Sequence, residues 1–193
     1  GRWIVFHEII GKDMGAIRFA EILKREIAKN KWDHLTMKFI GDPAGNQMAQ
    51  VSEHTPFMML RASGISAYPA PSNDISVRVE AVESVINRMA DGLPCLTVSP
   101  TCTSLISGFE GGYQFKRMYY MGNERYEEKP DKNRFSHCHD ALQYAFLGGG
   151  EGRRVMLGGQ RPSTPTTVER VSNPFARLKR RNRDRDKGSV RAL

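Results

Sequence analysis

The chain has 193 residues, of which 39% are hydrophobic and 26% charged, so one folded domain with a sizeable core is expected. Its formal net charge at pH 7 is +8. Eight basic and two acidic residues lie between positions 177 and 193, so this segment carries +6 of that charge. We predict a folded domain over residues 1–150 and a flexible basic tail over residues 151–193, whose charge suits phosphate or an acidic partner.

Several classes of protein are disfavoured by the sequence. No apolar run approaches the length of a membrane span, and early charged residues interrupt any signal-peptide pattern. Cys95, Cys102 and Cys138 are odd in number and widely spaced, which predicts free thiols in a reducing compartment. Zinc on His137, Cys138 and His139 would need a second ligand pair, which the sequence lacks. A self-contained ATP motor is excluded because there is no GxxxxGK[ST] motif.

The predicted elements alternate between strands and helices. Residues 2–10 are β-branched and aromatic, which favours a strand, and residues 16–28 repeat apolar side chains at helical spacing after a cap at Asp13. Residues 35–40 alternate as a strand. Further along we predict helices over 57–62, 74–90, 101–109 and 136–146, strands over 66–69 and 94–98, and a hairpin over 113–126. This order is typical of an α/β fold.

Asp42 follows the strand predicted over residues 35–40, within the sequence Gly-Asp-Pro-Ala-Gly. Open α/β sheets place their ligand sites at the carboxyl ends of strands, which makes this side chain a candidate ligand. The alternative is that Asp-Pro-Ala-Gly is present only because it forms a good turn.

A second candidate site lies at the start of the late helix. Ser136 is a predicted helix cap, and His137 and Asp140 are three residues apart, so they are expected to share a helix face. A histidine and a carboxylate projecting together can hold a hard divalent metal or orient a water. Alternatively, Asp140 only complements the helix dipole and His137 is a solvated neighbour.

Basic residues on two other segments suit nucleic acid. The hairpin interleaves Lys116 and Arg117 with aromatic residues, as a strand lying on nucleic acid does. The same mixture is found on ordinary edge hairpins blunted by charge. Arg78 and Arg88, on the helix predicted over 74–90, are interpreted as solvated helix charges rather than phosphate contacts.

The segments Ile40–Gly45 and Phe135–Ala145, taken together, resemble the C-terminal nuclease domain of the large terminase subunit of tailed bacteriophages. Ser136 to Ala145 matches that family's S-H-x-x-D-A-L-x-Y-A helix, and Asp42 matches the aspartate of its G-D-P-A-G turn. The resemblance covers roughly residues 1–147. It implies an RNase H-like fold, a mixed sheet flanked by helices, whose first strand and catalytic aspartate are absent from this chain. Glu8 and Asp13 are poor substitutes for that aspartate.

The resemblance implies a metal-dependent endonuclease that cuts concatemeric double-stranded DNA with two Mg²⁺ or Mn²⁺ ions about 4 Å apart. Asp42 and Asp140 would hold the ions, with His137 assisting at the second metal or positioning a water. The expected DNA contacts are Lys116, Arg117, Lys132 and Arg134. Without the first-strand aspartate, the chain alone is expected to be a poor nuclease.

The implied partners are an upstream ATPase domain in the same polypeptide, the portal protein and the small terminase subunit. They would meet at the procapsid in the host cell cytoplasm, with no membrane involved. Two alternatives stay open. The chain is another RNase H-like enzyme such as a resolvase or recombinase, or it is a non-catalytic DNA- or portal-binding module in which Asp42 and Asp140 only cap helices.

Overall fold

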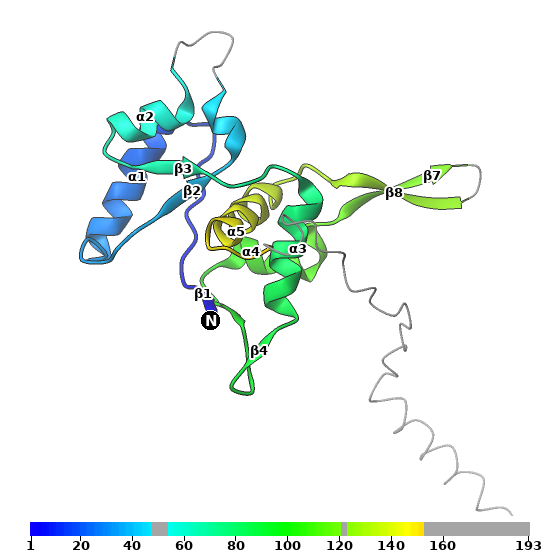
Figure 1. Ribbon diagram of the computed structural model, residues 1–193. Helices are drawn as coiled ribbons and strands as arrows, with labels where there is room; N and C mark the ends of the chain where they lie inside the picture. Colours follow the sequence, from blue (N-terminus) through cyan, green and yellow to red (C-terminus); the bar gives the residue numbers. More distant parts are fainter. Residues whose placement is uncertain (48–53, 121–122, 153–193) are drawn as a thin grey trace, which may run out of the picture. The chain divides into compact units, whose positions relative to one another are not determined.

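The structure is a computed structural model that describes residues 1–47, 54–120 and 123–152. The chain divides into two units, Gly1–Gly159 and Gln160–Leu193. The first is a mixed α/β unit (Figure 1). The basic tail predicted over residues 151–193 lies almost wholly outside the described residues. None of the helices in the described ranges is both long enough and apolar enough to cross a membrane.

The described part of the chain contains five α-helices: α1 (Ala16–Lys29), α2 (Pro56–Ala62), α3 (Ile75–Ile86), α4 (Thr103–Ser107) and α5 (Ser136–Gly148). Two further turns of helix are η1 (Pro43–Asn46), a 3-10 helix, and η2 (Gly108–Gly112), a π-helix. The strands are β1 (Trp3–Val5), β2 (Phe39–Gly41), β3 (Ala67–Pro69), β4 (Met89–Ala90), β5 (Leu93–Pro94), β6 (Leu96–Val98), β7 (Phe115–Tyr120) and β8 (Asn123–Pro130).

These strands pair two by two. β1 runs parallel to β6, and β2 runs parallel to β3. The antiparallel pairs are β4 with β5 and β7 with β8, the latter forming the long hairpin of Figure 1. The predicted hairpin is therefore confirmed. Within the described residues the ladders stay separate, so they do not form the single mixed sheet expected from the sequence.

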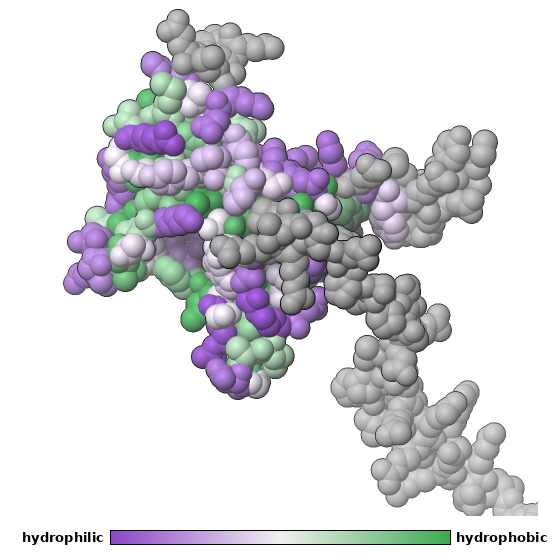
Figure 2. Space-filling model, viewed as in Figure 1, coloured by the Kyte–Doolittle hydropathy of each residue, from purple (hydrophilic) through white to green (hydrophobic). Residues whose placement is uncertain are grey.

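Two clusters of buried side chains hold the described elements together. The larger joins α3, α4 and α5 through Ala81, Val82, Val85, Cys95, Cys102, Leu105, Leu142, Phe146 and Leu147. The smaller joins α1, α2 and β3 through Ala20, Phe57, Ile65 and Ala67. Large hydrophobic side chains also reach solvent, among them Ile4, Phe6, Ile17 and Met89. The face shown in Figure 2 accordingly mixes hydrophobic and hydrophilic residues. At the centre of this arrangement, α5 contacts α3, α4 and β2.

Several predicted elements, among them the following two, are shorter than the sequence suggests. The strand expected over residues 2–10 ends at Val5, because its partner strand β6 ends at Val98 and the chain then turns into α4. The helix expected over 74–90 ends at Ile86, and Met89 pairs with Pro94 across a hairpin instead. Asp91 and Gly92 both have positive φ, at 54° and 74°, which is the conformation that a tight two-residue hairpin turn requires.

Two predicted helix caps are also wrong. Gly15, not Asp13, is the N-cap of α1, and Asp13 has a positive φ of 51°. Ser136 is the first residue inside α5, where its buried hydroxyl donates to the Asn133 carbonyl at 2.8 Å. The entry to α5 is fixed instead by Asn133, whose side-chain oxygen accepts from the backbone N–H of Phe135 at 2.9 Å.

Candidate functional site: the Asp42–Asp140 pocket

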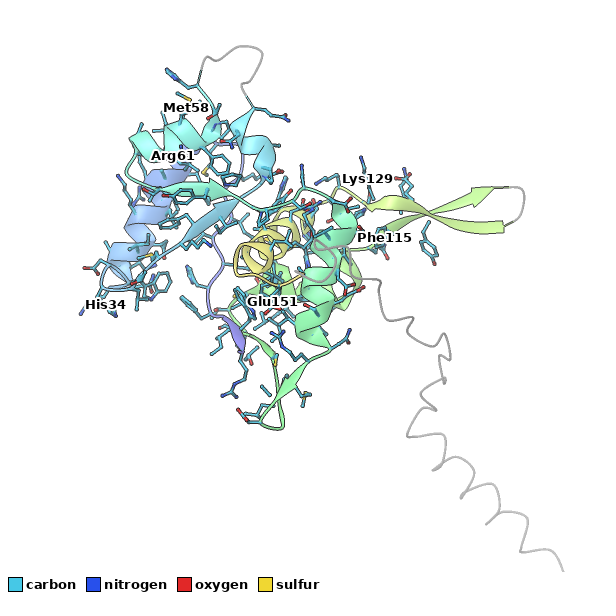
Figure 3. The ribbon with its side chains drawn as sticks, viewed as in Figure 1. His34, Met58, Arg61, Phe115, Lys129 and Glu151 are labelled. Carbon is cyan, nitrogen blue, oxygen red and sulfur yellow. The ribbon has the colours of Figure 1, made fainter. Side chains whose placement is uncertain are left out.

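Asp42 and Asp140, which are almost a hundred residues apart in sequence, line one pocket of about 450 Å³. We call it the Asp42–Asp140 pocket. Its other lining residues are Asn73, Asp74, Ile75, Arg78, Tyr113, Lys129, Pro130, Lys132, Ser136 and Tyr144. They come from the end of β2, the start of α3, the base of the β7–β8 hairpin and the first three turns of α5. Figure 3 shows Lys129 at the base of that hairpin.

Asp42 stands at the carboxyl end of β2, as predicted. It also forms the N-cap of η1, because its Oδ1 accepts from the backbone N–H of Ala44 at 2.8 Å. Both sequence interpretations of Asp42 are therefore compatible with the structure: the residue shapes the Asp-Pro-Ala-Gly turn and its exposed carboxylate faces the pocket.

Asp140 is held between two cations. Its Oδ1 accepts from Arg78 Nη1 at 2.9 Å, and its Oδ2 accepts from Lys132 Nζ at 2.9 Å. The Asp140 side chain is 17% exposed, that of Arg78 10% and that of Lys132 74%. The pair with Arg78 is thus shielded from water, whereas the pair with Lys132 lies at the surface and is screened by salt.

Arg78 is not the solvated helix charge expected from the sequence. Besides its bond to Asp140, its guanidinium lies 4.8 Å from the ring centroid of Tyr144, within the range of a cation–π contact. Its Nε is buried and has no hydrogen-bond partner among the described residues. The position follows from helix packing, because α3 contacts α5 and brings Arg78 to Asp140 and Tyr144.

Tyr144 and Tyr113 supply hydroxyl groups to the same pocket. Tyr144 donates to Asn73 Oδ1 at 2.6 Å, and Tyr113 accepts from Gln143 Nε2 at 2.9 Å. Burial raises the pKa of Tyr144 to about 12, with the negative charges of Asp42 and Asp140 adding to the rise and Arg78 opposing it. The pKa of Tyr113 is raised as well, mainly by burial. Both hydroxyls therefore stay protonated at neutral pH.

His137 lies elsewhere. It is exposed and lines a separate pocket with Ile9, Met14, Arg134 and Cys138, which shares no residue with the Asp42–Asp140 pocket. Residues three apart on a helix differ by only about 60° around its axis, which is why a shared face was expected, but the two side chains line different pockets. The structure therefore does not bring His137 together with Asp140.

His139, two residues further on, is buried. Its ring stacks on Tyr113 with centroids 4.5 Å apart, and its Nε2 lies 3.2 Å from the Leu105 carbonyl. Burial lowers the pKa of this imidazole, so at neutral pH it is an uncharged packing group.

The residues expected to contact DNA are dispersed. Lys132 lines the Asp42–Asp140 pocket, and Arg134 lines the pocket of His137, with its guanidinium over the Phe135 ring at 4.6 Å. Lys116 is exposed on β7, where its Nζ lies 3.6 Å from Glu127 Oε1 on β8. Arg117 belongs to β7, but its side chain lies outside the described part of the structure.

Glu8 and Asp13, considered as substitutes for the absent aspartate, do not line the Asp42–Asp140 pocket. The Glu8 carboxylate accepts from the backbone N–H groups of Ser104 and Leu105, at 2.9 Å and 3.1 Å, and so holds the start of α4. Asp13 is an exposed turn residue.

The pocket contains carboxylate oxygens, which are the ligands that a hard divalent ion prefers. Magnesium is commonly bound by one or two carboxylates, with water and substrate phosphate completing its shell, and Asp42 and Asp140 supply two carboxylates. Within residues 1–47, 54–120 and 123–152, no three His, Cys, Asp or Glu side chains gather closely enough to form a larger ligand cluster.

Five further residues line the pocket but were not predicted from the sequence as site residues: Arg78, Lys129, Asn73, Tyr113 and Tyr144. For Tyr144 a signal was present, since it follows Asp140 by four residues and so lies one turn along the same helix face. For Arg78 the spacing to Asp74 placed it one turn into α3, but nothing in the sequence connects it with α5.

Comparison with known proteins identifies no relative. No protein-family model matches the chain, and neither the curated proteins nor the solved structures contain a significant match.

Proposed function

We propose that the chain is a divalent-metal-dependent endonuclease domain of RNase H-like type, of the kind found in viral DNA-packaging terminases. The observation that carries this proposal is the convergence of Asp42 and Asp140 on one pocket that also contains Arg78, Lys129 and Lys132. Carboxylates for a metal and cations for a phosphate are the two charge types that phosphodiester hydrolysis needs side by side.

A bound divalent ion supplies a Lewis acid, which activates water and stabilises charge on the phosphate. In this chain Asp42 and Asp140 would hold it. Lys129 and Lys132 would neutralise the phosphate backbone of the DNA, and Arg78 would orient Asp140 from the buried side. The two-ion arrangement and a part for His137 remain predictions, as do the ATPase, portal and small-terminase partners implied by the resemblance.

A second candidate function has one observation in its favour. Both oxygens of Asp140 are already bonded to cations, as in a structural ion-pair network. In that case the pocket would be a rigid docking surface of a non-catalytic DNA- or portal-binding module, and Asp140 would only support α5 against α3.

Cleavage of supercoiled plasmid in Mn²⁺ distinguishes the two. We would compare this chain with a version extended at its N-terminus by the first strand that the resemblance implies, each with Asp42→Asn, Asp140→Asn and the exposed-surface control Asp33→Asn. Nicking that is lost in the first two variants and kept in the control supports the nuclease. Intact plasmid with both proteins at high concentration supports the docking surface.

A further inference from the structure

The two cations on Asp140 differ in how firmly they are placed. Arg78 is buried, bonded at 2.9 Å and stacked on Tyr144, whereas Lys132 reaches Asp140 at the same distance from a side chain that is 74% exposed. Holding a long exposed lysine in one geometry costs side-chain entropy, so the Lys132 contact is weak and easily exchanged for another.

Arg78 has donor capacity that the described residues do not use. A guanidinium carries five N–H groups, and the buried Nε of Arg78 lacks a partner. An unpaired donor buried in this way is costly. This Nε is enclosed by protein atoms, which fixes Arg78 in place, so the cations that a ligand with acceptor oxygens can reach are the exposed Lys129 and Lys132.

The lining of the pocket is balanced in charge. Three cationic side chains, those of Arg78, Lys129 and Lys132, face three carboxylates, those of Asp42, Asp74 and Asp140. A phosphate that enters this pocket without a metal ion would gain little binding free energy, because Arg78 and Lys132 are already bonded to Asp140. A divalent cation on the carboxylates would leave the pocket with an excess of two positive charges.

We propose that a divalent ion and a phosphate group bind this pocket cooperatively, because the ion takes Asp140 from Lys132 and frees this cation for the phosphate, while Arg78 stays bonded to Asp140. This inference rests on the proposed function and adds that Lys132 and the metal ion compete for Asp140. Lys132 thereby opposes metal binding and favours phosphate binding, and the coupling between the two ligands must be reciprocal.

The test is calorimetric titration of MnCl₂ into the intact chain and into Lys132→Met, which keeps the aliphatic stem but removes the charge. Lys29→Met is the matched control, because Lys29 is 70% exposed and pairs with Glu26 on α1, away from the pocket. Lys132→Met should bind Mn²⁺ about two- to fivefold more tightly, as expected for loss of one exposed competing pair. Lys29→Met should match the unsubstituted chain.

The second half of the test uses thymidine 5′-monophosphate, which offers a phosphate but no phosphodiester bond to cut. With Mn²⁺ present, and after correction for ion bound by free nucleotide, it should bind the unsubstituted chain at least fivefold more tightly than without Mn²⁺. This gain should shrink in Lys132→Met and persist in Lys29→Met.

The outcomes separate this inference from the proposed function. If Mn²⁺ binds the chain but not Asp42→Asn, while Lys132→Met changes neither metal nor nucleotide affinity, the coupling is wrong and the metal site stands. Equal nucleotide affinity with and without Mn²⁺ also overturns the coupling. If the unsubstituted chain binds no Mn²⁺, the inference and the proposed function fail together.

Discussion

At the scale of single residues, the environment of Asp140 decides what this side chain does. The motif around it placed a carboxylate in the first turns of a late helix, and the structure agrees. Its partner Arg78 is 62 residues away and belongs to another helix. No local pattern connects the two, because the contact arises only when α3 packs on α5. Asp140 could therefore be predicted from the sequence, whereas its cationic partner Arg78 could not.

Asp140→Asn is expected to destabilise the metal-free protein by about 2–3 kcal/mol at pH 7, because removing one partner leaves the buried Arg78 without its counter-ion. Urea unfolding followed by circular dichroism measures this change. Asp33→Asn, at an exposed position, should change the free energy of unfolding by less than about 0.5 kcal/mol. An equal or greater stability of Asp140→Asn would mean that the carboxylate is held in a strained, repulsive site and that Arg78 contributes no net stabilisation.

At the level of helices and strands, the spacing of apolar residues predicted where helices form, but the sequence did not predict where the elements end. The periodicity of residues 16–28 predicted α1 to within a residue at its end, and Asn30 is its C-cap. The helix over 74–90 was overextended because Met89 continues the apolar pattern, although its backbone belongs to a hairpin. The early end of β1 depends on where β6 turns away. Such boundaries are set by a partner elsewhere in the chain.

The contact of α4 with α5 leaves no room for a side chain at Gly108. A Cβ atom there would overlap the imidazole of His139, which is fixed by Tyr113 and the Leu105 carbonyl. Gly108→Ala should therefore cost about 1–3 kcal/mol through overpacking. Gly15→Ala is the matched control, because a Cβ at Gly15 meets nothing within 4 Å.

Thermal unfolding of the two glycine variants checks this prediction. A clearly lowered midpoint for Gly108→Ala is expected, with a smaller change for Gly15→Ala, which only weakens the N-cap of α1. Equal midpoints would show that His139 can move, and that the stack on Tyr113 does not anchor α5.

At the scale of the whole described unit, the class of fold was predictable and its assembly was not. Alternating strand and helix patterns predicted a mixed α/β unit, which is confirmed. The joining of strands into ladders depends on pairings distant in sequence, such as Trp3 with Leu96. Glu151, labelled in Figure 3, joins three distant parts of the chain. Its carboxylate accepts from Trp3 Nε1 at 2.9 Å and pairs with Arg88. Local patterns carry no information on such contacts.

Glu151→Gln tests the contact of Glu151 with Arg88 and Trp3. Hydrogen bonds from Arg88, and more weakly from Trp3, lower the pKa of Glu151 below its usual 4.5, although partial burial opposes the shift. A carboxyl whose pKa is lower in the folded than in the unfolded state contributes stability above pH 4.5 and loses it as pH falls through the folded value. The variant should be less stable by about 1–2 kcal/mol at pH 7.

The difference between the two proteins should then shrink as the pH falls from 4.5 toward 3, as measured by chemical unfolding across that range. Glu127→Gln, which removes a surface ion pair with Lys116 at 3.6 Å, should change stability by at most about 0.5 kcal/mol. A difference for Glu151→Gln that does not depend on pH would contradict the ion pair as its cause.

We propose that Asp42 and Asp140 form one site for a divalent ion. Adding substoichiometric Mn²⁺ to isotopically labelled protein and recording which backbone amide signals broaden tests this site, because paramagnetic broadening falls steeply with distance. We predict that the first signals lost belong to residues around Asp42, Arg78 and Asp140, and that Asp42→Asn abolishes the effect. First loss of signals elsewhere, for example around Glu26 and His7, whose side chains lie 3.6 Å apart, would contradict this site.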